Sequence, residues 1–137
     1  MENILNKIRK NNDTSKEEKN IIRLIKGSIS SIIISVIFLF VYAIVLTYTT
    51  VPESTMPLVI TVIIGVSILI GSSISSMKIK KNGFINGGVV GLIYMLFLYI
   101  SSSMALSGFS INLNTLILII SGIVVGMIGG IIGVNIK

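Results

Sequence analysis

Residues 113–134 read LNTLILIISGIVVGMIGGIIGV, an apolar stretch of 22 residues that contains no Lys, Arg, Asp or Glu. A helix needs about 20 residues to cross roughly 30 Å of hydrocarbon at 1.5 Å per residue. Three more stretches without charge cover about 27–49, 57–77 and 84–103. Too little polar sequence remains to cover four such helices in a water-soluble core. The sequence therefore predicts an all-α integral membrane protein with four transmembrane helices, arranged as two similar hairpins in a bundle.

The composition excludes several classes of protein. The chain has 137 residues, of which 53% are hydrophobic and 12% charged, and its mean hydropathy is +0.99. Soluble domains carry about 25% charged residues, so neither a soluble nor a disordered protein fits. The absence of Cys and His excludes a disulfide, a zinc site of the Cys/His type and histidine-based catalysis. We expect no metal, no cofactor and no enzymatic activity.

The basic residues predict the orientation of the chain in the membrane. Seven of the eleven lie in residues 1–26, and the last is Lys137. The remaining three, Lys78, Lys80 and Lys81, lie in the connection between the second and third stretches. Basic segments are retained in the cytoplasm. We therefore expect a multi-pass protein of the bacterial cytoplasmic membrane, with both termini in the cytoplasm and these three lysines as topology determinants.

The segment before the first stretch is predicted to be a cytoplasmic polar tail, residues 1–26, followed by the transmembrane domain, residues 27–137. A cleavable signal peptide does not fit, because the apolar stretch is too long and no cleavage site follows it. The first twelve residues fit either a short amphipathic helix at the membrane surface, with Ile4, Leu5 and Ile8 on one side, or a frayed tail. The frayed tail is expected, since short isolated helices are marginal in water. A helix is expected to begin near Thr14 or Ser15, because each has a Glu three residues later, as in a capping box. The net charge of the tail, about +3, is too dilute to predict a nucleic-acid partner.

Glycines recur at a spacing of four in the last two stretches. The third stretch contains Gly83, Gly87 and Gly91, and the fourth contains Gly122, Gly126 and Gly130, with Gly129 and Gly133 as a second pair. This spacing places small residues on one helix face, where another backbone can approach closely in lipid. We therefore predict tight helix packing through these faces.

Small residues also recur between the two halves of the chain. Gly27, Ser31 and Ser35 match Gly83, Gly87 and Gly91 at an offset of 56 residues. Ser67, Gly71 and Ser75 match Gly122, Gly126 and Gly130 at an offset of 55 residues. Either a duplicated hairpin or biased composition explains the match. Because these residues all lie toward the basic ends of the stretches, the bundle is predicted to be narrow at that end and broader at the other.

Charged side chains are missing from all four stretches. A charge within the bilayer costs roughly 2.5–3.5 kcal/mol on insertion scales and is kept mainly for proton, ion or substrate coupling. A transporter driven by a membrane carboxylate is therefore not expected. Glu53 is interpreted as a solvated acid in a turn. Asn86, about one turn into the third stretch, is predicted to form an interhelical hydrogen bond.

The chain resembles the YrzE-like family, a group of small four-helix membrane proteins of Gram-positive bacteria that has no assigned activity. The resemblance covers about residues 22–137. It is carried by GSISS at the start of the first stretch, by ILIGSSISSMKIKKNGFINGGVVGLIYML around the basic loop, and by the ending SGIVVGMIGGIIGVNIK. It implies a protein of the cytoplasmic membrane and transfers no catalytic residue.

Two functions remain open from the sequence. The first is a structural or interaction module in the lipid bilayer that packs through its glycine faces, against a second copy or within a larger membrane complex. This hypothesis assumes that the third and fourth helices carry more glycine surface than one bundle needs. The second is a small oligomeric channel or facilitator for uncharged or weakly polar solutes, with Ser, Thr and Asn along its path.

Overall fold

The computed structural model describes residues 1–105, 108 and 111–136, and this part of the chain forms four α-helices and a single 3₁₀ turn. The helices are α1 (Glu2–Tyr48), α2 (Met56–Ile79), α3 (Gly83–Ala105) and α4 (Leu113–Asn135), with the turn η1 (Glu53–Thr55) before α2. All four helices are long and apolar enough to cross a membrane. The predicted all-α membrane fold with four transmembrane helices is therefore confirmed. Lys137 lies outside the described residues.

Helix α1 corrects the expectation for the start of the chain. It is one continuous helix of 47 residues that begins at Glu2, so residues 2–12 are helical rather than frayed. The hydroxyls of Thr14 and Ser15 donate to the carbonyls of Lys10 and Asn12, inside the helix, and cap no helix start. No Gly or Pro interrupts residues 1–26. Since the apolar part of α1 is already helical, each preceding residue can extend the helix without the cost of a new nucleus.

The reversal between α2 and α3 is short because two residues adopt left-handed backbone. Lys80 has φ 54° and Asn82 has φ 52°, and the Lys80 N–H donates to the Ser76 carbonyl at 3.0 Å. This bond satisfies one of the free carbonyls at the end of α2. The chain turns within three residues, and α3 begins at Gly83.

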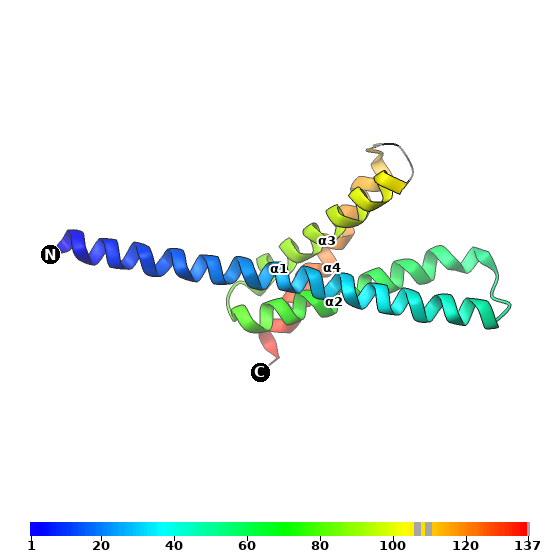
Figure 1. Ribbon diagram of the computed structural model, residues 1–137, viewed down its shortest axis with the longest axis horizontal. Coiled ribbons are helices and arrows are strands. Elements are labelled where there is room, and N and C mark those ends of the chain that lie inside the picture. The colour runs from blue at the N-terminus through cyan, green and yellow to red at the C-terminus, as the bar shows by residue number, and fades with distance from the viewer. Residues whose placement is uncertain (106–107, 109–110, 137) are drawn as a thin grey trace.

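The helices form two hairpins, α1–α2 and α3–α4, which meet at one end and diverge at the other (Figure 1). They meet near the connection between α2 and α3, where α4 also ends. They separate toward the α1–α2 and α3–α4 connections. The predicted taper, narrow at the end with the basic loop, agrees with this arrangement. Beyond the narrow end α1 continues alone, well past the other helices (Figure 1).

Small residues fill the interior of the bundle. Among the described residues, the buried hydrophobic side chains are Ile68, Val90 and Tyr94. The other buried positions are glycines and serines, whereas most large apolar side chains are exposed on the outside of the helices. Lipid solvates such an apolar surface, so helix association relies on close backbone approach rather than on burial of large side chains.

Candidate functional site

The contact between α3 and α4 is made by facing glycines. A Cβ added at Gly87 would overlap the Gly126 carbonyl oxygen and lie 2.7 Å from the Gly130 Cα. The same holds along the contact, where the facing pairs are Gly83 with Gly130, Gly87 with Gly126 and Gly91 with Gly122. Backbone therefore meets backbone at these pairs, and no larger residue fits without moving a helix.

A second glycine face of α4 packs against α2. A Cβ at Gly133 would lie 2.7 Å from the Ser73 Cα, and one at Gly129 would lie 2.7 Å from the Leu69 carbonyl oxygen. The Ser73 hydroxyl donates across this contact to the Gly129 carbonyl at 2.8 Å. Both glycine faces of α4 are thus occupied within one copy. The assumption that the third and fourth helices carry surplus glycine surface is therefore wrong. The spacing of glycines predicts that a helix face is close-packed, but it does not say which helix packs against that face.

The contact between α1 and α2 repeats this geometry with serine. A Cβ at Gly27 would lie 2.5 Å from the Ser75 Cβ, and one at Gly71 would overlap the Ser31 hydroxyl. Residue pair 27 and 75 corresponds to 83 and 130 in the other hairpin, and pair 31 and 71 corresponds to 87 and 126, at the offsets of 56 and 55 residues noted in the sequence. The two hairpins therefore use the same positions for their contacts.

Asn86 requires a correction. Its side-chain amide donates to the Lys81 carbonyl at 2.8 Å, within the connection that precedes α3, and not to another helix. The two left-handed residues of the reversal bring this carbonyl over the first turn of α3. Lys78 lies in the last turn of α2, and Lys80 and Lys81 are exposed in the reversal. The structure thus gathers these lysines at the narrow end of the bundle.

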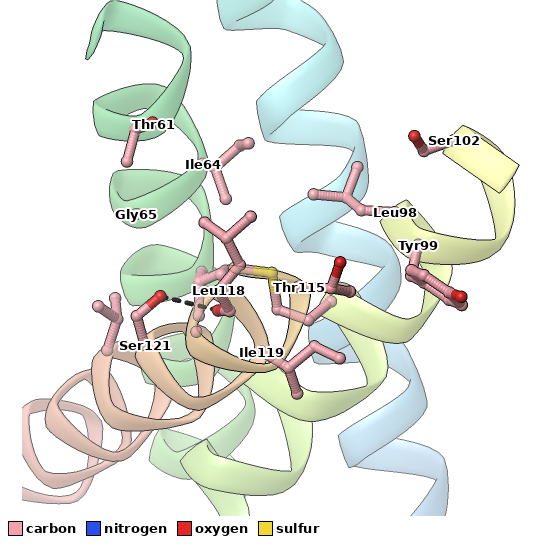
Figure 2. Close-up of a pocket in the computed structure, with 14 residues that line it drawn as sticks. Thr61, Ile64, Gly65, Leu98, Tyr99, Ser102, Thr115, Leu118, Ile119 and Ser121 are labelled. Atoms are coloured by element: carbon pink, nitrogen blue, oxygen red, sulfur yellow. Dashed lines mark hydrogen bonds between the residues drawn. The ribbon is translucent and has the colours of Figure 1, made fainter. Parts of the chain in front are cut away.

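A cleft of about 360 Å³ lies where the hairpins diverge, lined by residues of α2, α3 and α4. Most of the lining is apolar, with hydroxyls at Thr61, Tyr99, Ser102, Thr115 and Ser121. Figure 2 shows that the lining side chains come from all three helices. The Ser121 hydroxyl donates to the Leu118 carbonyl of its own helix at 2.7 Å. The Thr61 hydroxyl likewise donates to the Pro57 carbonyl of its own helix at 2.7 Å. The wall is thus mostly apolar, and two of its hydroxyls are satisfied within their own helices, which suits a largely apolar occupant.

Gly65, in the wall of the cleft, differs from the other glycines of the helices. Every other described helical glycine has an atom of a neighbouring helix within 4 Å of the position that a Cβ would take, whereas Gly65 has none. Sequence reasoning missed Gly65 and the cleft. Gly65 belongs to no run of glycines at a spacing of four. The angle at which the hairpins diverge cannot be predicted from the sequence of any single helix.

The chain matches the family model described as "Protein of unknown function (DUF3792)" over residues 20–133. No curated protein and no solved structure matches it. The match bears out the expected membership of an uncharacterised family, and the likeness to YrzE-like proteins of Gram-positive bacteria stays a prediction.

Proposed function

The chain belongs to the DUF3792 family, and we propose that this member is a non-enzymatic interaction module that binds a transmembrane helix of a partner protein in the cleft between its two hairpins. The observation that carries the proposal is Gly65. Small residues at a membrane helix surface allow another backbone to approach closely. Gly65 offers such a surface within a cleft, where a Cβ added to it would have no atom of the other described helices within 4 Å.

The remaining geometry supports the same role. The glycine contacts fix the narrow end, so the divergence of the hairpins is maintained by packing of backbone against backbone. Hydroxyls on the cleft wall, such as those of Thr61 and Thr115, are of the kind that form hydrogen bonds between membrane helices, typically about 0.6 kcal/mol each. A helix in the cleft would thus meet a small residue, apolar side chains and a few hydroxyls.

The cleft favours this module over a channel or facilitator. On α2 its lining extends no further toward the narrow end than Ile68, which is fully buried, and nearer that end the glycine and serine contacts bring the helices together. A solute in the cleft therefore meets packed backbone before it reaches the narrow end. Conduction would need a path along other surfaces, between copies.

Cysteine crosslinking in intact membranes tests the proposal, because the chain has no Cys of its own. A thiol-reactive photocrosslinker on Thr115→Cys, in the cleft wall, is expected to give one defined adduct with a membrane-spanning protein. Adding Gly65→Leu fills the cleft from the opposite wall and should abolish the adduct. Gly65→Leu is compatible with folding, since its Cβ meets no neighbour within 4 Å.

Val62→Leu is the matched control, because Val62 lies on the same helix and is 56% exposed outside the cleft lining. It should leave the adduct unchanged. An adduct of twice the chain mass would identify the partner as a second copy. An adduct that persists with Gly65→Leu, or crosslinking to lipid alone, would contradict the proposal.

The membrane orientation is part of the proposal. From the basic residues at the narrow end we infer that this end lies in the cytoplasm and that the cleft lies toward the outer face. Single cysteines at Ser54 and Asn82 should then react from opposite sides with a membrane-impermeant thiol reagent. Reaction of both from outside would overturn the orientation and leave the cleft unaffected.

A further inference from the structure

Three basic side chains surround a second cavity at the narrow end of the bundle, in a region separate from the cleft. Arg23 and Lys26 of α1 and Lys78 of α2 line this basic pocket, whose volume is about 250 Å³. The other lining residues are Gly27, Ile29, Ser30, Ile74 and Ser75. No Asp or Glu is among the described residues that line it. The pocket therefore concentrates positive charge without an internal counter-charge.

Two hydrogen bonds between the helices hold the pocket together. The Arg23 guanidinium donates through Nη1 to the Lys78 carbonyl at 2.6 Å. The Ser75 hydroxyl donates to the Arg23 carbonyl at 3.1 Å. These bonds fix the middle of α1 relative to the last turns of α2. A guanidinium has five N–H groups, so Arg23 keeps donors for an anion after it has bound the carbonyl.

The pocket is amphipathic along the direction of the helices. Its basic residues lie at the border of the charge-free stretches, and Ile29 and Ile74 lie further into them. These isoleucines are 50% and 37% exposed, so both present apolar surface to the lipid. A ligand that matches the pocket carries an anionic group at one end and a hydrocarbon chain at the other.

We infer that this basic pocket binds the phosphate headgroup of an anionic phospholipid, with an acyl chain along Ile29 and Ile74. Basic pockets between transmembrane helices attract anionic headgroups, and each Lys or Arg near the surface contributes to binding. Charge-assisted hydrogen bonds to phosphate oxygens are shorter and stronger than neutral ones. Free phosphate would use the cations but not the two isoleucines, and so the lipid is the better match.

The test is lipid titration of the full chain in detergent, followed by native mass spectrometry. Phosphatidylglycerol should bind more tightly than phosphatidylcholine. The variant K26Q/K78Q should weaken binding of phosphatidylglycerol by about fivefold per lysine, or roughly 25-fold in all. Arg23 is left intact because it also bonds α2. The control K80Q/K81Q removes the same charge from the neighbouring reversal and should change binding by less than about threefold.

Three further arms decide between explanations. K26R/K78R keeps the charge and should bind phosphatidylglycerol as the parent chain does. K26Q/K78Q and K26R/K78R should also unfold like the parent chain. If they do not, the loss of binding comes from the fold, which would contradict a binding role. Equal losses in K26Q/K78Q and K80Q/K81Q would contradict a defined pocket. Inorganic phosphate, added at the concentration of the lipid phosphate, should not displace the lipid, and full displacement would show that the site binds the free anion instead.

Discussion

In the α3–α4 hairpin glycine faces glycine at three successive pairs, whereas in the α1–α2 hairpin glycine faces serine at two of the corresponding pairs, Gly27 with Ser75 and Gly71 with Ser31. Both arrangements bring two helices close together at the narrow end of the bundle. They differ in what blocks a larger residue. In α3–α4 the obstacle at Gly126 is the Gly87 backbone, and in α1–α2 the nearest obstacle at Gly71 is the Ser31 side chain.

The difference shows how serine can stand in for glycine inside a membrane protein. The Ser31 hydroxyl donates to the Gly27 carbonyl of its own helix at 3.1 Å, and the Ser67 hydroxyl donates to the Ile63 carbonyl at 2.7 Å. Each serine therefore adds little volume and satisfies its donor locally. The α1–α2 contact can change by trimming a side chain. The facing residues of the α3–α4 contact are glycines, so no side chain there can be made smaller.

The largest effect is expected for Gly126→Ala in the α3–α4 hairpin. The new Cβ would overlap the Gly87 carbonyl oxygen, so the helices must separate, at a cost of about 2–3 kcal/mol in the free energy of unfolding. Denaturant titration in detergent, followed by circular dichroism, measures the loss. Gly65→Ala is the matched control and should be neutral or stabilise by up to about 1 kcal/mol, since Ala favours a helix over Gly. Equal effects of the two variants would contradict the backbone contact.

A smaller loss, about 1–2 kcal/mol, is expected for Gly71→Ala in the α1–α2 hairpin. Its Cβ meets the Ser31 hydroxyl first and the Gly27 carbonyl oxygen at 2.8 Å. Adding Ser31→Gly removes the first obstacle and leaves the Gly27 carbonyl oxygen, so the double variant should recover part of the lost free energy in the same titration. No recovery would show that the two hairpins are equally rigid and remove the distinction between them.

The smallest loss, about 0.5–1 kcal/mol, is expected for Asn86→Ala, because its hydrogen bond to the Lys81 carbonyl lies at an exposed reversal. The bond is outside the contact of either hairpin. Unfolding of the variant, compared with Gly71→Ala, measures the contribution of the reversal. A loss as large as that of Gly126→Ala would mean that the reversal, rather than the glycine pairs, holds the narrow end together.

The fold and the close-packed faces were predictable from the sequence, and their partners were not. Stretches without charge define the helices, and the spacing of four defines a face on each helix. Nothing in that spacing says that Gly129 and Gly133 meet α2 while Gly126 meets α3. Asn86 shows the same limit, since its partner depends on the left-handed backbone of Lys80 and Asn82. The cleft depends on the angle between the hairpins, which no single stretch encodes.

The N-terminal part of helix α1 forms a long lever that extends from the bundle. About 25 residues of this continuous helix precede Gly27, and at 1.5 Å per residue they form a rod of roughly 37 Å. The rod is joined to α2 at its base through Arg23 and Ser75. A tilt of about 10° at that base would sweep the far end through roughly 6 Å, by simple leverage on this length. A small rearrangement where the hairpins meet would therefore displace the tip of α1 by about the size of a side chain.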